Sequence, residues 1–377
     1  MKLLHDLERP ADAVRHLGPN WFASVMGTGI VANAAVLLPV HVAGARAFAA
    51  AVWVAAALLL AVLVAATALH WLRHPQNARR HALEPAMAPF YGAPPMAFLT
   101  VGAGALLVGR DLIGLHPAVV VALVLWTIGT VTGLLSSVAI PVLMFTRHRL
   151  TLEGTFATWL MPVVPPMVSA ATGAALVAHL PAGQARLTLV LACYAMFGLS
   201  LLASLMTMPL VWARLSYRDV GPAAMVPTLW IMLGPLGQSV TAANTLGDAA
   251  AGVVPAPYAD AMAATGLLYG VPVWGFAMLW LAIAATITLR TARAHLPFSL
   301  TWWGFTFPVG TCVTGTSLLA ARTGASVLDW CSLALCLLLL AAWAIAAAFT
   351  LRGCLRGRLF LPPPRPEPAP RPEPAPA

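Results

Sequence analysis

The polar side chains inside the long apolar runs of this chain are neutral, and neutral donors suit the passage of an anion. Serine, threonine, asparagine and glutamine recur within these runs, whereas Glu153, Asp260 and Asp329 lie close to their ends. Hydroxyl and amide donors, with N–H groups freed at helix kinks, can replace part of the hydration shell of an anion. The sequence puts no ionisable residue near the middle of a run, so an anion would meet no fixed negative charge there. The pattern predicts a conduit for small anions.

Eight residues are our candidates for the lining of this conduit. Any single hydroxyl among them also has a plainer interpretation, because Ser and Thr side chains often bond to their own helix or join two helices in a membrane. The candidates are Thr28, Gly29, Asn33, Thr100, Thr158, Gln238, Ser239 and Phe305.

The sequence predicts no metal site and no cofactor. His70, His74 and His81 lie beside several arginines, but only His70 and His74 have a ligand-like i, i+4 spacing. No Cys or carboxylate joins that pair at close range, so a hydrated loop is the better interpretation. The five cysteines form no C-x-x-C pair and lie in or beside apolar runs, which is typical of buried thiols.

The same distribution of residues disfavours an enzyme. Intramembrane hydrolysis needs paired carboxylates or sets of His and Glu within the spans, and the apolar runs contain neither. A transferase acting through Arg73, Arg79 and Arg80 would have only Glu84 nearby for acid–base chemistry. A structural or scaffolding membrane protein is a third class, and it would not need kinked helices around a cavity.

One short motif suggests a nucleotide enzyme and fails on its context. Gly27-Thr28-Gly29-Ile30-Val31-Ala32 matches G-x-G-x-x-A, the dinucleotide-binding fingerprint. That fingerprint requires a preceding strand and an acidic residue about 20 positions later. No Asp or Glu occurs between Asp12 and Glu84, and the glycines lie within a continuous apolar run. We therefore place the glycines within a membrane helix.

The composition indicates an integral membrane protein. Of the 377 residues, 60% are hydrophobic and 9% are charged, against about 25% charged in soluble domains. Runs of at least about 18 apolar residues can cross a bilayer, and the chain has ten. Their approximate limits are 19–39, 47–72, 88–108, 117–145, 154–178, 186–213, 222–246, 260–289, 298–321 and 326–351.

The basic residues predict the orientation of these spans. With the amino terminus inside, 17 of the 21 Lys and Arg residues fall in cytoplasmic segments, which are normally enriched in them. We expect a cytoplasmic segment over residues 1–18, a membrane domain over 19–351, and a basic and then proline-rich cytoplasmic tail over 352–377, disordered in its proline-rich part. The net charge of +9 is then explained without nucleic acid.

The spans alternate in character, which predicts two layers of helices. The third, fifth, seventh and ninth runs carry interior prolines, and the first carries Gly27 and Gly29 instead. Helix breakers free backbone groups that must find partners inside the protein or in a water-filled cavity. We expect an all-α fold of five helical hairpins, with the odd helices inside around a central pore and the even helices outside.

Two motifs carry a resemblance to a known family. PNWFASVMGTGIVAN at 19–33 and LPFSLTWWGFTFPVG at 296–310 resemble the tellurite-resistance/dicarboxylate transporter family, over roughly residues 15–350. The family includes a bacterial tellurite-resistance membrane protein, fungal malate permeases, fungal sulfite efflux pumps and the plant slow anion channels. The resemblance implies a homotrimer in which each subunit has its own pore, lined by five inner helices.

The resemblance also implies a gate. In the anion-channel members a phenylalanine plugs the pore, in a context like F-x-x-L-aromatic-L one helix before the tryptophan motif. Phe276-Ala277-Met278-Leu279-Trp280-Leu281 matches this context here. The resemblance therefore predicts that Phe276 is the gate.

The function expected from the sequence is the transport of a small anion. A C4-dicarboxylate such as malate is the first expectation, and sulfite or another oxyanion the second. A chloride- or nitrate-type channel and a tellurite-resistance protein are alternatives of the same fold. The high Ala and Arg content with a single Lys favours a bacterial inner membrane.

Overall fold

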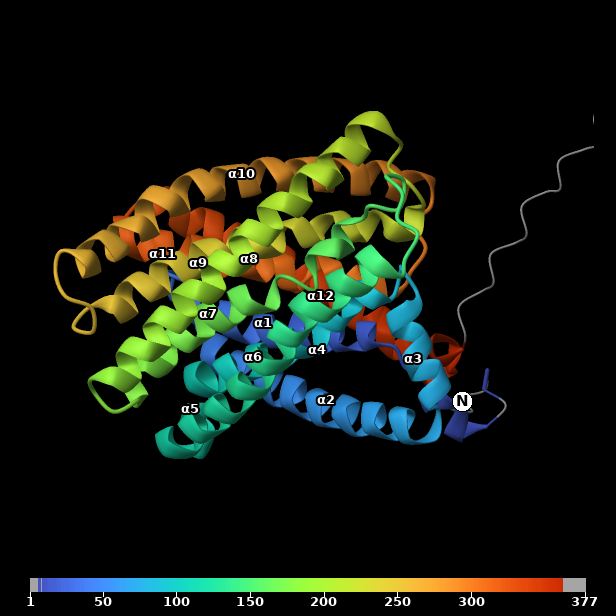
Figure 1. The fold of residues 1–377 in the computed structure, drawn as a ribbon, viewed down its shortest axis with the longest axis horizontal. Coiled ribbons are helices and arrows are strands. Elements are labelled where there is room, and N and C mark those ends of the chain that lie inside the picture. The colour runs from blue at the N-terminus through green and yellow to red at the C-terminus, as the bar shows by residue number, and fades with distance from the viewer. Residues whose placement is uncertain (1–5, 8, 362–377) are drawn as a thin grey trace, which may run out of the picture.

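The computed structural model describes residues 6, 7 and 9–361, which form helices and their connections without a strand. The expectation of an all-α protein is confirmed for this part of the chain. The main helices are α1 (Phe22–Leu37), α2 (Ala45–Arg73), α4 (Ala93–Gly104), α6 (Leu115–Thr146), α7 (Pro165–Leu176), α8 (Gln184–Tyr217), α9 (Leu233–Ala250), α10 (Tyr258–Ala294), α11 (Phe307–Thr323) and α12 (Ser326–Arg356). Two short helices, α3 (Pro75–Leu83) and α5 (Arg110–Ile113), lie at opposite ends of the molecule (Figure 1).

Several helices are preceded by a tighter 3₁₀ stretch, and three of these stretches contain proline. Such stretches precede α1, α4, α9 and α11, and another lies shortly before α7. Proline is tolerated there because the first helical N–H groups have no intrahelical partner. The stretches are η2 (Pro19–Trp21), η3 (Ala88–Gly92), η5 (Ala157–Leu160), η7 (Ala223–Met232) and η8 (Leu300–Phe305). The remaining short turns are η1 (Pro10–Val14), η4 (Ala105–Gly109), η6 (Val177–His179) and η9 (Arg358–Phe360).

Eight helical passages in the described residues are long and apolar enough to cross a membrane. The passages 157–179 and 300–323 are not among the eight, because neither is one uninterrupted helix. A turn separates η5 from α7 in the first passage and η8 from α11 in the second. The interruptions coincide with Pro162, Pro165 and Pro308, the residues that marked these runs as kinked. The structure is therefore that of a multi-pass membrane protein with at least eight spans.

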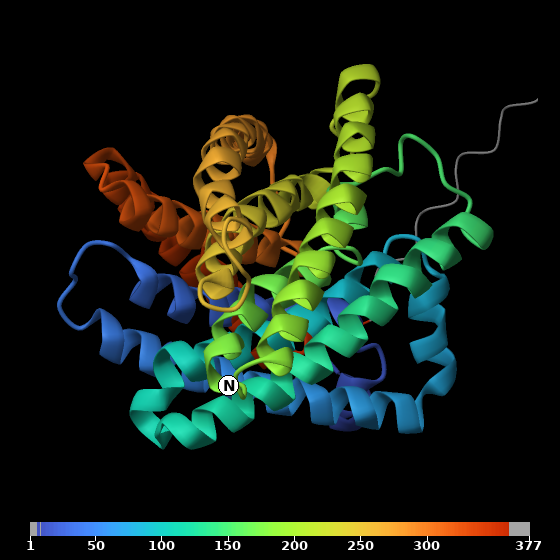
Figure 2. The ribbon, with the colours of Figure 1, turned by 60° about the vertical axis from the view of Figure 1, so that its left-hand side comes forward.

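The helices form an inner ring and an outer layer (Figures 1 and 2). Helix α1 contacts α4, α4 contacts α7, α7 contacts α9, α9 contacts α11, and α11 returns to α1. Each ring helix also contacts the helix that follows its passage along the chain: α2, α6, α8, α10 and α12 in turn. In the most apolar stretches of the α1 and α9 passages 78% of residues are buried, against 22–33% for the five outer helices. Inner helices are thus covered by protein, and outer helices expose apolar side chains.

The two glycines of the G-x-G motif lie where α1 touches its ring neighbours. A Cβ atom at Gly27 would lie 2.2 Å from Oγ1 of Thr306, just before α11. A Cβ atom at Gly29 would lie 2.9 Å from Cγ2 of Thr100 in α4. Glycine therefore serves close helix approach here, which is its usual role in membrane helix contacts.

The ends of the chain differ in detail from the expected division. Helix α12 continues to Arg356 and is followed by η9, so the tail begins later than residue 352. The segment before α1 packs on the membrane domain: Trp21 stacks on Phe360 with ring centroids 5.2 Å apart. The proline-rich tail predicted to be disordered lies outside the described residues from 362 onward.

A buried arginine ties two connections together at the end of α8. Arg214 is 1% exposed. Its Nε donates to the carbonyl of Glu153 at 3.2 Å, its Nη2 donates to the carbonyl of Val220 at 2.6 Å, and its guanidinium lies 4.2 Å from the ring centroid of Phe156. The connections on either side of α7 and α8 are thereby held at fixed positions relative to the ring.

We expect Arg214→Met to destabilise the fold. The substitution removes two charge-assisted hydrogen bonds and the cation–π contact, so the free energy of unfolding should fall by about 3 kcal/mol. Arg218→Met is the matched control, because Arg218 forms an exposed ion pair with Glu153 and such pairs contribute less than about 1 kcal/mol. Chemical unfolding in detergent micelles, followed by tryptophan fluorescence, measures both. Equal losses for the two variants would contradict the clamping role.

Candidate functional site

One cavity inside the ring has six neutral polar side chains among its fourteen lining residues and is called here the polar cavity. Its volume is about 140 Å³, and all five ring helices contribute to it. It corresponds to roughly four or five water molecules at about 30 Å³ each. Its lining residues are Ile30, Asn33, Leu37, Ala103, Leu106, Leu107, Ala171, Thr172, Ala175, Gln238, Thr241, Thr245, Thr314 and Leu318. No charged side chain is among them.

A second cavity, called here the apolar cavity, lies toward the end of the ring where α1 begins. Its volume is only about 30 Å³, roughly that of a single water molecule. Thr228 and Thr301 supply its hydroxyls, and the rest of the lining is apolar. The other lining residues are Ala23, Met26, Phe90, Met96, Met161, Val164, Ile231, Gly234, Pro235, Leu300, Gly304, Phe307 and Pro308. Because the space is small and apolar, a hydrated ion does not fit in this conformation.

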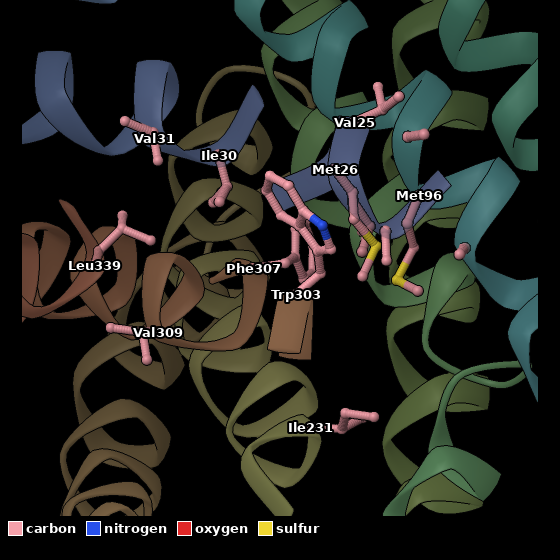
Figure 3. Packing of buried hydrophobic residues seen from close by; sticks show 14 of the residues in the cluster. Val25, Met26, Ile30, Val31, Met96, Ile231, Trp303, Phe307, Val309 and Leu339 are labelled. Atoms are coloured by element: carbon pink, nitrogen blue, oxygen red, sulfur yellow. The ribbon is translucent and has the colours of Figure 1, made fainter. Parts of the chain in front are cut away.

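The two cavities follow each other along the ring helices within about one turn. On α1, Met26 lines the apolar cavity and Ile30 lines the polar cavity. On α9, Pro235 lines the apolar cavity and Gln238 lines the polar cavity. At 1.5 Å of rise per residue, the junction is about 5 Å long. Phe307 and Pro308 are the α11 residues of the apolar cavity nearest to this junction, and Phe307 is 2% exposed. Figure 3 shows Phe307 grouped with Trp303, Met26 and Met96.

Gln238 is the most available donor in the polar cavity. Its side chain is 5% exposed, and its amide has no hydrogen-bond partner among the described residues. Thr241 and Thr314 contact each other at 2.8 Å between Oγ1 atoms, and each is also within hydrogen-bond distance of a carbonyl of its own helix. Each hydroxyl group can therefore rotate and donate its proton to a different acceptor. The cavity offers neutral hydrogen-bond donors to a small anion.

The two ends of the ring differ in charge. At the end where α5 lies, Arg46 pairs with Asp111, and Arg322 pairs with Asp248. At the opposite end, arginines such as Arg73, Arg147 and Arg290 form no ion pair with a described carboxylate. A cluster of unpaired cations raises the local concentration of anions. This end is the one at which the apolar cavity lies.

The eight residues expected to line the path fall into two groups. Asn33 and Gln238 line the polar cavity. Asn33 also donates from Nδ2 to the carbonyl of Thr100 at 3.1 Å, which joins α1 to α4. The other six are buried residues that line neither cavity: Thr28, Gly29, Thr100, Thr158, Ser239 and Phe305.

The contacts of these six residues show what they do instead. Thr28 Oγ1 accepts a hydrogen bond from Trp343 Nε1 at 3.2 Å, on the face of α1 that points to α12. Thr100 and Ser239 bond to carbonyls of their own helices. Phe305 packs edge-on against Trp230, with ring centroids 5.2 Å apart. The expectation that these side chains line an anion path stays a prediction.

Phe276 lies away from the ring interior. It belongs to the outer helix α10, is 37% exposed, and lines a groove against Met208, Pro209 and Trp212 of α8. A side chain on this outer face plugs neither of the two cavities. The six-residue context that led to Phe276 was too short to distinguish α10 from a ring helix. The aromatic ring beside the junction is Phe307, whose position directly before Pro308 was the available signal in the sequence.

The histidines of the α2–α3 corner form a stacked cluster. The ring of His70 lies 5.4 Å from that of His81 and 6.2 Å from that of His74, between centroids. His70 Nδ1 lies 2.8 Å from the carbonyl of Val14, so this nitrogen is the donor. Within the part of the chain that the structure describes, no group of three or more potential ligands is arranged for a metal ion.

Burial in this cluster, together with the smaller effects of the neighbouring His70 and His16, lowers the pKa of His81 to about 4. In the unfolded chain His81 takes up its proton near its ordinary pKa of 6.5. The contribution of neutral His81 to stability is therefore complete above pH 6.5 and is lost as the pH falls toward 4.

We expect His81→Gln to reduce the acid sensitivity of the fold. The midpoint of thermal unfolding should fall less between pH 6.5 and 4 in the variant than in the wild type. His41→Gln, at an exposed loop position, is the control and should follow the wild type. Tryptophan fluorescence in detergent across this pH range measures all three proteins. Identical pH profiles for His81→Gln and the wild type would show that His81 is not the responsible group.

Comparison with known proteins agrees with the ring and its neutral cavity. A family model described as SLAC1, voltage-dependent anion channel, matches residues 16–351. An uncharacterized transporter of Methanocaldococcus jannaschii is 27% identical over 360 residues, covering 95% of this chain and 99% of that protein. A sulfite efflux pump of Arthroderma otae is 27% identical over 345 residues, covering 90% and 91%. A sulfite efflux pump of Candida albicans is 23% identical over 325 residues, covering 80% and 65%.

The matched proteins are channels and transporters rather than enzymes, and the family match runs from before α1 into α12, so it includes all five ring helices. The resemblance suggested by the two motifs at 19–33 and 296–310 is thereby confirmed at the level of the family. The chain belongs to the SLAC1 family of voltage-dependent anion channels.

Proposed function

We propose that this protein carries a small oxyanion, sulfite first, across a membrane through the interior of its helix ring. The observation that carries the proposal is the polar cavity, which is bounded by all five ring helices and has neutral hydroxyl and amide groups and no charged side chain in its otherwise apolar lining. An anion entering it exchanges water for hydroxyl and amide groups and meets no carboxylate. The names of the curated relatives from fungi favour sulfite among the small anions.

The proposed path runs through both cavities in turn. The interrupted passages 157–179 and 300–323 are counted as crossings, so ten helices span the membrane as five hairpins. The unpaired arginines lie on the cytoplasmic side, which puts both termini inside, and the membrane is the inner membrane of a bacterium.

The junction beside Phe307 is the closed point of the path, because an aromatic ring in a narrow apolar neck excludes ions by size and dewetting. The protein forms a homotrimer, and each subunit has its own path.

The size and chemistry of the polar cavity favour sulfite over malate. Malate carries two carboxylates, and recognition of carboxylates commonly uses the bidentate donors of arginine. The polar cavity has no arginine in its lining and a volume of about 140 Å³. A compact oxyanion with one charged centre fits the neutral lining better. Chloride, nitrate and tellurite remain substrates to be compared directly in the same assay.

The decisive experiment is an anion flux measurement on the purified protein in liposomes. Radiolabelled sulfite uptake is recorded with equal concentrations of malate, chloride, nitrate or tellurite as competitors. We expect sulfite uptake well above protein-free liposomes, with the strongest competition from other compact oxyanions.

The outcomes separate the candidate substrates. Competition by malate alone would move the assignment to a dicarboxylate carrier, and preferential chloride current would move it to a halide channel. Absence of flux for every anion, in the wild type and in a variant with an enlarged junction, would contradict the transport proposal itself.

A further inference from the structure

A long apolar groove runs between the first and the last outer helices, and it is called here the α2–α12 groove. Its volume is about 570 Å³. One wall is α2 from Ala55 to Ala66, and the other is α12 from Trp343 to Cys354. Its floor is the outward face of α1, with Ser24 and Thr28, and the ring of Trp303.

An aromatic pair lies near each end of this groove. Near its deep end Phe48 meets Trp343 edge-on, with ring centroids 6.3 Å apart. At the other end Trp21 stacks on Phe360, and both line the groove. Since α2 and α12 are membrane-crossing helices, the open side faces the hydrocarbon interior of the bilayer.

The groove has the length of one leaflet. Each wall covers eleven steps along its helix, which is about 16 Å at 1.5 Å per residue. The hydrocarbon core of a bilayer is about 30 Å thick, so one leaflet contributes about 15 Å. Thr28 marks the deep end, and it is the middle residue of the passage Pro19–Leu37. The groove therefore extends from the middle of the membrane to one interface.

The polar atoms of the groove are already paired, which leaves an apolar ligand as the match. Ser24 Oγ donates to the carbonyl of Trp21, Thr28 Oγ1 accepts from Trp343 Nε1, and Thr350 Oγ1 accepts from Trp303 Nε1. An apolar space in contact with lipid does not hold water, because water finds no partners there. A hydrocarbon chain can pack against the apolar walls without breaking any of these hydrogen bonds.

The interfacial end of the groove is positively charged. Helix α2 ends at Arg73, and Arg352 and Arg356 lie in the last turns of α12. All three side chains are exposed, and none forms an ion pair with a described carboxylate. Basic residues at this depth attract anionic lipid headgroups.

We propose that the α2–α12 groove binds one acyl chain of an anionic phospholipid, whose headgroup lies among Arg73, Arg352 and Arg356. The inference is independent of which anion the protein carries. The bound chain lies on the face of α1 opposite to the one that lines the two cavities.

Native mass spectrometry of the full-length protein tests this site. Phosphatidylglycerol and phosphatidylcholine with the same acyl chains are added to delipidated protein. We expect one retained phosphatidylglycerol per chain and weaker retention of phosphatidylcholine. Ala347→Trp fills the groove and should reduce retention at least about tenfold, whereas Ala348→Trp, on the exposed side of the same helix, should retain lipid like the wild type. Removing the charge with Arg352→Gln and Arg356→Gln should abolish the preference between headgroups.

Two results would overturn the proposal. One is equal lipid retention by Ala347→Trp and Ala348→Trp. The other is loss of subunit association in Ala347→Trp with unchanged lipid retention, which would make the groove a contact between copies of this chain.

A second measurement needs no variant. Phosphatidylglycerol with a photoreactive acyl chain should crosslink to residues 55–66 and 343–354 of the wild-type protein. Labelling spread evenly over the exposed faces of α6 and α8 would contradict a defined site.

Discussion

Replacing Phe307 by alanine should raise the rate of anion flux by at least about tenfold, equivalent to lowering the barrier by about 1.4 kcal/mol. The Phe307 ring lines the apolar cavity, whose volume is only about 30 Å³. Removing the ring joins that space to the polar cavity of about 140 Å³. Water can then enter the neck, and the cost of dehydrating an ion there falls. Sulfite uptake into liposomes, and anion current across a planar bilayer, measure the change.

Phe276→Ala is the matched control for this prediction. Phe276 is the residue that the family resemblance favoured, but it lies on the outer helix α10 against α8. We expect its alanine variant to conduct like the wild type. If Phe276→Ala conducts more while Phe307→Ala, correctly folded, conducts like the wild type, the gate belongs to Phe276 and the closed point of the path lies elsewhere.

The second large effect is expected for Gln238→Glu, which should nearly abolish anion flux. The substitution keeps the size of the side chain and places a carboxylate in a cavity that now has no charge. Two like charges about 4 Å apart repel by about 4 kcal/mol at an effective dielectric constant of 20, which corresponds to roughly a thousandfold loss of flux. Lowering the pH protonates the introduced carboxyl group and should restore part of the flux, which separates a charge effect from misfolding.

Gln238→Leu serves as the uncharged control. It removes one hydrogen-bond donor to the anion, so we expect a reduction of about fivefold. Sulfite uptake measured at neutral and acidic pH distinguishes the two variants. If Gln238→Glu transports sulfite as well as the wild type at neutral pH, Gln238 does not face the path.

Prolines and glycines in the sequence indicated helix interruptions and close helix contacts, but prolines did not separate the layers, because the outer helices α6, α8 and α10 also contain Pro141, Pro209 and Pro272. Pro165 and Pro308 lie in passages that the structure divides into two helical segments each. Gly27 and Gly29 marked α1 as a helix in close contact with others, and a Cβ atom at either position would collide with a neighbouring helix.

The face of each inner helix was not predictable in the same way. Helix α1 is apolar and buried on nearly all sides, so no polar stripe distinguishes the side of Asn33 from the side of Thr28. Asn33 faces the polar cavity, whereas Thr28 faces α12 and receives the hydrogen bond of Trp343. Only the packing of α2, α4, α11 and α12 around α1 settles the assignment. The pattern around Phe276 has the same limit, since a short aromatic motif fits an outer helix as well as an inner one.

The uneven distribution of arginines has an electrical consequence. Arginines at the α5 end pair with Asp111 and Asp248, whereas those at the opposite end are largely without carboxylate partners. Anions therefore accumulate at one mouth of the path and not at the other. Current carried from the basic mouth should exceed current in the reverse direction at equal and opposite voltage, so the conductance rectifies. Because mobile ions screen exposed charges within about 10 Å at 0.1 M salt, this rectification should fade as the ionic strength rises, while the selectivity set inside the ring stays the same.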